Sequence, residues 1–188
     1  MALKFPFFRR SPRPDPVRDA YARIVEQARQ PVFYAVAGVP DTVDGRFELI
    51  ALHAFLVLNR LKAGHDEVGN FGARDFGQRL FDLMFADMDQ ALREMGVGDL
   101  GVGREVKRMA KAFFGRVAAY EAGLRGGEGA QGEVLHEALR RNLFGTADSA
   151  AAKVEPVAAY LREAASLLAG IEVAEIVAGR VRFPSPEL

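Results

Sequence analysis

The 188-residue sequence contains no cysteine and only three histidines. Without cysteine the chain can form no disulfide, no thiolate nucleophile and no cysteine-ligated zinc or iron–sulfur site. Its 25 basic and 25 acidic side chains cancel to a formal net charge of zero. Any attraction to nucleic acid or lipid must therefore come from a local patch. We expect no cofactor, no bound metal and no DNA partner.

A long apolar run is also missing. The longest, from Leu49 to Asn59, is enclosed by Glu48 and Arg60 and is well short of the roughly 20 residues that a membrane-spanning helix needs. Residues 1–8 do not form a secretory signal, because their apolar stretch is too short and the charges and prolines follow it. We therefore expect the protein to stay in the compartment where it is made, the cytoplasm.

Apolar residues recur at helical spacing along most of the chain, and no segment alternates with the period of a strand. Hydrophobic residues make up 49% of the sequence and charged residues 27%, which is typical of a folded globular protein. We predict an all-α fold of about seven helices in one domain over residues 16–180. A basic, aromatic tail (1–15) and a C-terminal tail (181–188) flank it. The expected helices cover about residues 16–30, 42–62, 76–95, 104–124, 133–144, 148–169 and 171–177, with a short helical turn between the first two.

The second of these helices, 42–62, is expected to be central and buried, because apolar residues occupy most of its circumference. One narrow polar seam interrupts it, formed by residues seven apart, and cations on a buried helix need partners. We predict an internal polar network in which Asp87 or Glu94 pairs with Arg46, His53 or Arg60. A structural, register-setting role is favoured over a functional cleft.

Two groups of residues are candidates for partner binding. On the helix expected over 104–124, four basic residues lie nearly opposite the apolar stripe with no acidic residue among them: Arg104, Lys107, Arg108 and Lys111. The N-terminal tail combines rings with positive charge at Phe7, Phe8, Arg9 and Arg10. The tail suits the headgroups of an anionic membrane or a ribosomal RNA surface. The basic helix face could contact RNA phosphates, anionic lipid or an acidic partner. A solvated helix face and a loose terminus are the alternatives.

No complete catalytic motif is present. Glu133 and His136 have the Glu-x-x-His spacing of a di-iron site, but such a site needs a second copy, and the other histidines lack it. The glycines between residues 96 and 103 lack the Gly-Lys-Ser/Thr ending of a phosphate-binding loop. We therefore expect no catalytic residue and no enzyme activity. A redox or haem-handling enzyme is a weaker alternative, which a coloured or metal-loaded purified protein would reveal.

Two long runs of sequence carry a resemblance to a known family. The first contains "PVFY" from Pro31 and "GVPDTVDGRFELIALHAFLVLNRL" from Gly38, and the second is "LFDLMFADMDQALREMGVGDLGVGREVKRMAKAFFGRVAAYEAGL" from Leu80. Together they resemble the ubiquinol-cytochrome c chaperone family, which includes mitochondrial assembly factors for the cytochrome bc1 complex and bacterial relatives. The resemblance covers residues 17–125 well and the C-terminal part more loosely.

This resemblance implies a non-enzymatic assembly chaperone that binds newly made cytochrome b at the membrane surface. It also implies a small partner protein, a place near the ribosome, and a peripheral position on the inner face of the inner membrane. The residues alone leave open an alternative, a helical adaptor that contacts lipid or the ribosome through the four basic residues between Arg104 and Lys111.

A chaperone for an apolar segment needs a groove with adaptable side chains. The candidates to line such a groove are Met84, Met88, Met95 and Met109, although methionines at helical spacing are more often ordinary core residues.

Overall fold

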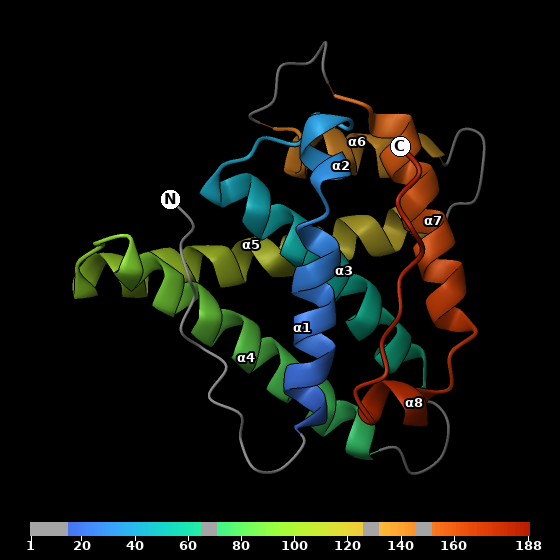
Figure 1. Cartoon of the computed structure of the whole chain (residues 1–188), viewed down its shortest axis with the longest axis horizontal. Coiled ribbons are helices and arrows are strands. Elements are labelled where there is room, and N and C mark those ends of the chain that lie inside the picture. The colour runs from blue at the N-terminus through green and yellow to red at the C-terminus, as the bar shows by residue number, and fades with distance from the viewer. Residues whose placement is uncertain (1–14, 65–70, 126–131, 146–151) are drawn as a thin grey trace.

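The computed structural model describes residues 15–64, 71–125, 132–145 and 152–188. These residues form eight α-helices and no strand (Figure 1). The all-α prediction is confirmed, and the short helical turn expected after the first helix is α2. The helices are α1 (Pro16–Ala28), α2 (Pro31–Ala35), α3 (Val43–Ala63), α4 (Phe71–Glu94), α5 (Asp99–Arg125), α6 (Gly132–Asn142), α7 (Val154–Ala169) and α8 (Val173–Val177).

Helix α3 is the centre of the fold, as predicted. Thirteen of its 21 residues are buried, and it packs against α1, α4, α5, α7 and α8. Its first turn is capped by Thr42, whose Oγ1 accepts a hydrogen bond from the backbone N–H of Gly45 at 3.1 Å. A Cβ at position 45 would lie 2.0 Å from the carbonyl oxygen of Pro40. Only glycine therefore lets the preceding loop fold back onto this turn.

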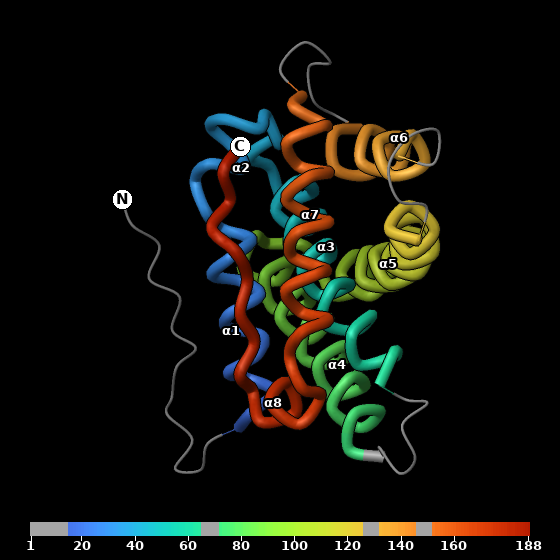
Figure 2. The backbone as a smooth tube through the Cα atoms, turned by 90° about the vertical axis from the view of Figure 1, so that its right-hand side faces the viewer, coloured from blue at the N-terminus to red at the C-terminus, as the bar shows by residue number. Residues whose placement is uncertain are grey.

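The other helices surround α3 on different sides. Figure 2 shows α1 and α5 at opposite edges of the molecule, with α3 and α7 between them and α6 beside α5. The C-terminal end of α4 and the beginning of α5 project together beyond the rest of the bundle (left in Figure 1). Within the described segments, no helix is long and apolar enough to span a membrane.

Three helix starts differ from the sequence prediction by five or six residues. Helix α4 begins at Phe71 instead of residue 76, and α5 begins at Asp99 instead of residue 104. Both extensions include glycines, which cost roughly 1 kcal/mol each in a helix. In α5 the fully buried Val102 provides packing that opposes this cost. Gly96, between the two helices, has φ 84°, the left-handed conformation that glycine commonly adopts just after a helix ends.

Helix α7 begins at Val154, six residues later than predicted. Pro156 is the third residue of this helix, within its first turn. The N–H groups of a first turn have no intrahelical acceptor, so a proline is tolerated there. Pro156 therefore lies in the turn that starts α7 and not in the interior of the helix.

Residues 181–188, expected as a C-terminal tail, contain no helix but pack closely along the bundle between α1 and α7 (Figure 2). Val181 is buried, and the ring of Phe183 stands perpendicular to His53 with 5.1 Å between the centroids. Gln27 of α1 donates a hydrogen bond from Nε2 to the carbonyl oxygen of Pro184 at 2.9 Å. This extended segment therefore closes the core over His53.

Candidate functional site

An apolar groove with a volume of about 370 Å³ lies between α3, α4 and α5. We call it the aromatic groove. Residues three or four apart on a helix share a face, so α3 and α5 each place several apolar side chains along one side of the groove. Helix α4 contributes one aromatic ring. The apolar side chains that line it are Phe55, Leu58, Phe81, Phe113, Phe114 and Val117.

A cluster of phenylalanines forms the α4–α5 side of the aromatic groove. The ring centroid of Phe81 lies 4.6 Å from that of Phe85, 5.7 Å from that of Phe113 and 5.5 Å from that of Phe114. Phe113 is 1% exposed, whereas Phe114 is 62% exposed. A large exposed aromatic ring at the mouth of an apolar groove is a common feature of protein-binding sites.

Polar side chains border the aromatic groove. Lys62 of α3 and Glu121 of α5 form an ion pair with 2.8 Å between Nζ and Oε1. The hydrogen bond from Lys62 is the main reason that the pKa of the Glu121 carboxyl lies below its usual range. Asn59 and Gln78 also line the groove. An apolar floor with a polar border suits an amphipathic or apolar helix.

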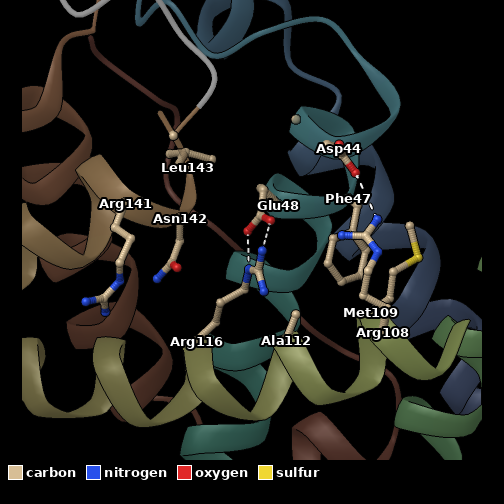
Figure 3. Close-up of a pocket in the computed structure, with 12 residues that line it drawn as sticks. Asp44, Phe47, Glu48, Arg108, Met109, Ala112, Arg116, Arg141, Asn142 and Leu143 are labelled. Carbon is tan, nitrogen blue, oxygen red and sulfur yellow. Dashed lines mark hydrogen bonds and ion pairs between the residues drawn. The ribbon is translucent and has the colours of Figure 1, made fainter. Parts of the chain in front are cut away.

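A second, polar pocket of about 250 Å³ lies where α3, α5 and the end of α6 meet (Figure 3). Its centre is an ion pair in which both Glu48 carboxylate oxygens accept hydrogen bonds from the Arg116 guanidinium. Burial raises the pKa of Glu48, and the bond from Arg116 opposes this effect. The guanidinium also lies 5.6 Å from the centroid of the Phe47 ring.

The charges of this polar pocket are largely matched within the pocket. Besides the central pair, Arg108 lies 3.6 Å from Asp44, and Asn142 faces the Arg116 side chain from α6 (Figure 3). In the described residues, no group of three or more histidine, cysteine or acidic side chains is placed to hold a metal ion. We interpret the pocket as a structural contact that holds the three helices together.

The predicted internal polar network does not form, because its cations have other partners. Arg46 is exposed and its Nε lies 2.7 Å from Asp41 in the loop before α3. Arg60 donates from Nε to the carbonyl oxygen of Ile171 at 3.1 Å. Both cations thus leave the seam toward nearby loops.

The acidic residues proposed for the same network are also engaged elsewhere. Asp87 accepts a hydrogen bond from the hydroxyl of Tyr21 on α1 at 2.8 Å. Glu94 accepts from Gln90 at 2.9 Å on its own helix, at the end of α4 that projects beyond the bundle (Figure 1). Helical spacing identified the polar positions, but the long-range packing that assigns their partners is not encoded in that spacing.

His53 is the one member of the predicted network that is fully buried. Its Nδ1 lies 2.7 Å from the carbonyl oxygen of Leu49, and its Nε2 lies 2.8 Å from the hydroxyl of Tyr160 on α7. That hydroxyl also accepts a hydrogen bond from Gln27 at 2.9 Å. Burial lowers the pKa of His53 to about 4. His53 therefore acts as a neutral hydrogen-bonding link between α3 and α7.

The four basic candidates on α5 separate into two groups. Arg108 forms ion pairs with Glu105 at 2.7 Å and with Asp44 at 3.6 Å, and it borders the polar pocket. Arg104, Lys107 and Lys111 are exposed. The other candidate group, Phe7, Phe8, Arg9 and Arg10, lies outside the described residues.

The aromatic groove was not predicted from the sequence. Met84, Met88 and Met109 are buried in the core, and Met95 is 51% exposed beyond the end of α4. Three of the four methionines are therefore ordinary core residues and do not line a groove. Phe114 is the residue that could have indicated an exposed aromatic surface from the sequence. It follows a phenylalanine on the apolar stripe of α5 and must point about 100° away from it.

Comparisons with known proteins agree on one family. The family model for the ubiquinol-cytochrome C chaperone matches residues 35–183. A crystal structure of the Cbp3 homolog from Brucella abortus has 34% sequence identity and a TM-score of 0.78, covering 92% of this chain and 90% of that one.

Two curated relatives are more distant. The ubiquinol-cytochrome-c reductase complex assembly factor 1 of Xenopus laevis is 24% identical over 148 residues, which are 79% of this chain and 70% of the relative. The corresponding factor of Drosophila melanogaster is 24% identical over 149 residues, and the match spans 79% of this chain and 56% of the relative.

Proposed function

The chain belongs to the ubiquinol-cytochrome c chaperone family, and from this premise we propose that it assists assembly of the cytochrome bc1 complex by binding newly made cytochrome b. The family is one of chaperones and not of enzymes. The matched relatives are named as assembly factors of the ubiquinol-cytochrome-c reductase complex. The role proposed here is therefore temporary binding of a subunit.

The aromatic groove is the proposed binding site for the client. A segment destined for the membrane is apolar, and outside the membrane it needs apolar contacts to replace water. The groove provides these contacts from three helices, and its polar border accommodates the more polar side of a bound helix. The polar pocket is less suitable, because four of the five charged side chains that line it, Asp44, Glu48, Arg108 and Arg116, already form ion pairs with one another.

The observation that carries this proposal is the exposure of Phe114. Its ring is 62% exposed although it stacks near Phe81 at 5.5 Å. Covering such a ring contributes up to about 1.5–3 kcal/mol, so leaving it in water is costly unless a partner covers it. A bound apolar segment would bury Phe114 and extend the phenylalanine cluster.

The proposed setting follows from the client. Cytochrome b is a membrane protein, so the chaperone would meet it at the cytoplasmic face of the inner membrane, near the ribosome that makes it. A small partner protein, which the family resemblance implies, is a further proposed component. In this setting the protein acts as a peripheral membrane factor.

Site-specific photocrosslinking tests the proposed site. A benzoylphenylalanine at position 114 should crosslink to cytochrome b in cells that are assembling the complex, because its ring would contact the bound segment. A matched probe at Leu167 on α7, which is also partly exposed at 36%, should give no such product. Mass spectrometry of the crosslinked species identifies the partner.

Two outcomes would overturn the groove proposal. In one, probes at positions 114 and 167 give equal yields of cytochrome b, which would indicate non-specific proximity. In the other, a probe at position 114 captures no cytochrome b while probes on another face do, which would place the client elsewhere.

A further inference from the structure

The outward face of α5 has an unusual composition. With 100° between successive residues, Leu100, Arg104, Lys107, Lys111 and Phe114 lie within about 80° of one another on the helix. All five are exposed. The buried residues of α5 lie on the opposite side: Val102, Met109, Phe113 and Tyr120. We call the exposed set the basic stripe.

The three cations of the basic stripe are not neutralised. No described residue forms an ion pair with Arg104, Lys107 or Lys111. The two acidic residues in the same part of α5 are engaged elsewhere, since Asp99 pairs with Arg93 and Glu105 pairs with Arg108 at 2.7 Å. The stripe therefore presents three positive charges toward solvent without competing anions.

Apolar side chains lie at both ends of the basic stripe. Leu100 is 95% exposed and Phe114 is 62% exposed, and the two residues are fourteen positions apart, which is about 21 Å along the helix. Met95, 51% exposed, lies just before the Leu100 end. Exposed Leu and Phe beside Lys and Arg are the composition of helices that lie in a membrane interface.

We propose that the basic stripe docks α5 on the surface of an anionic lipid bilayer. The three cations would contact lipid phosphates, and Leu100 would enter the boundary between headgroups and acyl chains, while Phe114 would lie beside the headgroups at the mouth of the groove. Figure 2 shows α5 at the edge of the molecule, opposite α1, where a flat surface can approach it. This lipid binding is separate from the proposed client binding, because it is expected on vesicles that contain no protein.

A bilayer fits these observations better than RNA does. Both present phosphates, but only a bilayer offers an apolar layer for an aliphatic side chain such as Leu100. Phe114 also belongs to the aromatic groove, so docking through the stripe would hold the groove entrance at the lipid headgroups. A client segment could then pass from the groove to the membrane without crossing water.

Vesicle sedimentation of the full-length protein tests the proposal. Wild type should bind vesicles of phosphatidylcholine mixed with phosphatidylglycerol, and binding should weaken as salt rises. The triple variant Arg104→Gln, Lys107→Gln, Lys111→Gln should bind on the order of a hundredfold more weakly, since each basic residue near an anionic surface contributes roughly fivefold. Leu100→Ser should weaken binding by about tenfold at any salt concentration.

The matched control removes the same charge from other exposed positions. The variant Arg74→Gln, Lys153→Gln, Arg182→Gln has the same net charge as the stripe variant and should bind like wild type, apart from a small non-specific loss. Equal weakening by both triple variants would overturn the proposal. The proposal would also be overturned if wild type did not bind these vesicles and instead bound purified ribosomes through the stripe. Neither result would affect client binding in the groove, which crosslinking measures separately.

Discussion

The burial of His53 predicts a loss of stability in mild acid. The imidazole lies among the rings of Phe33, Tyr160 and Phe183, at centroid distances of 5.5, 5.7 and 5.1 Å. Burial lowers its pKa to about 4 in the folded protein, against about 6.5 in the unfolded chain. The unfolded state therefore binds a proton first, so the folded protein loses stability as pH falls from about 6.5 through 4.

The size of this effect follows from the two pKa values. Between pH 7.5 and pH 5 the free energy of unfolding should decrease by about 2 kcal/mol, and the limiting loss below pH 4 is about 3 kcal/mol. A typical domain has a stability of only about 5–15 kcal/mol. The loss is therefore large enough to shift a denaturation midpoint clearly.

Urea denaturation at the two pH values measures this loss. His53→Gln should be less stable than wild type at pH 7.5, because it disturbs the bonds to Leu49 and Tyr160, but it should lose about 2 kcal/mol less on acidification. Gln27→Ala, which removes the hydrogen bond to the Tyr160 hydroxyl but keeps the imidazole, is the control and should keep the wild-type pH dependence of stability. The raised pKa of Glu48 has the opposite effect, because it makes the folded state more stable as pH falls. This effect is the same in wild type and in both variants. An equal loss in wild type and His53→Gln would refute the assignment to His53.

Substitutions at Glu48, Gly123 and Gly115 test the packing around α5. Glu48→Gln should lower the free energy of unfolding by about 3–5 kcal/mol, because it leaves the Arg116 guanidinium without its partner, and a Glu48→Gln, Arg116→Met double variant should recover part of this loss in thermal melts. Gly123→Ala should destabilise the protein by about 1–3 kcal/mol, because the new Cβ would lie 2.8 Å from Cα of Leu135 on α6. Gly115→Ala, where a Cβ meets nothing within 4 Å, should stabilise α5 by about 0.5–1 kcal/mol. Equal effects of the two alanines would contradict the close approach of α5 and α6.

The helical class and the central helix were predictable because both depend on local periodicity. A helix that is apolar around most of its circumference has to be buried, and α3 is. The caps were also local: Asp15 accepts from the N–H of Val17 at 3.2 Å, and Gly96 takes the left-handed conformation. These features need only a few neighbouring residues to specify them.

The partners of buried polar groups were not predictable from spacing. His53 was correctly placed on a buried seam, but its partner Tyr160 is 107 residues away. The Glu48–Arg116 pair joins residues 68 apart, and α5 meets α3 at a position that no periodicity specifies. The aromatic groove was missed for the same reason, because three helices have to converge before it exists.

Co-purification of cytochrome b at high salt tests the central proposal most directly. Tagged wild-type protein should retain cytochrome b from solubilised native membranes in high salt, because apolar contacts are not screened. Phe114→Asp should retain about 30-fold less, the loss expected for an aromatic residue at the centre of an interface, while Leu167→Asp should behave like wild type. Equal retention by all three proteins, or release of cytochrome b from wild type by salt alone, would contradict client binding in the aromatic groove.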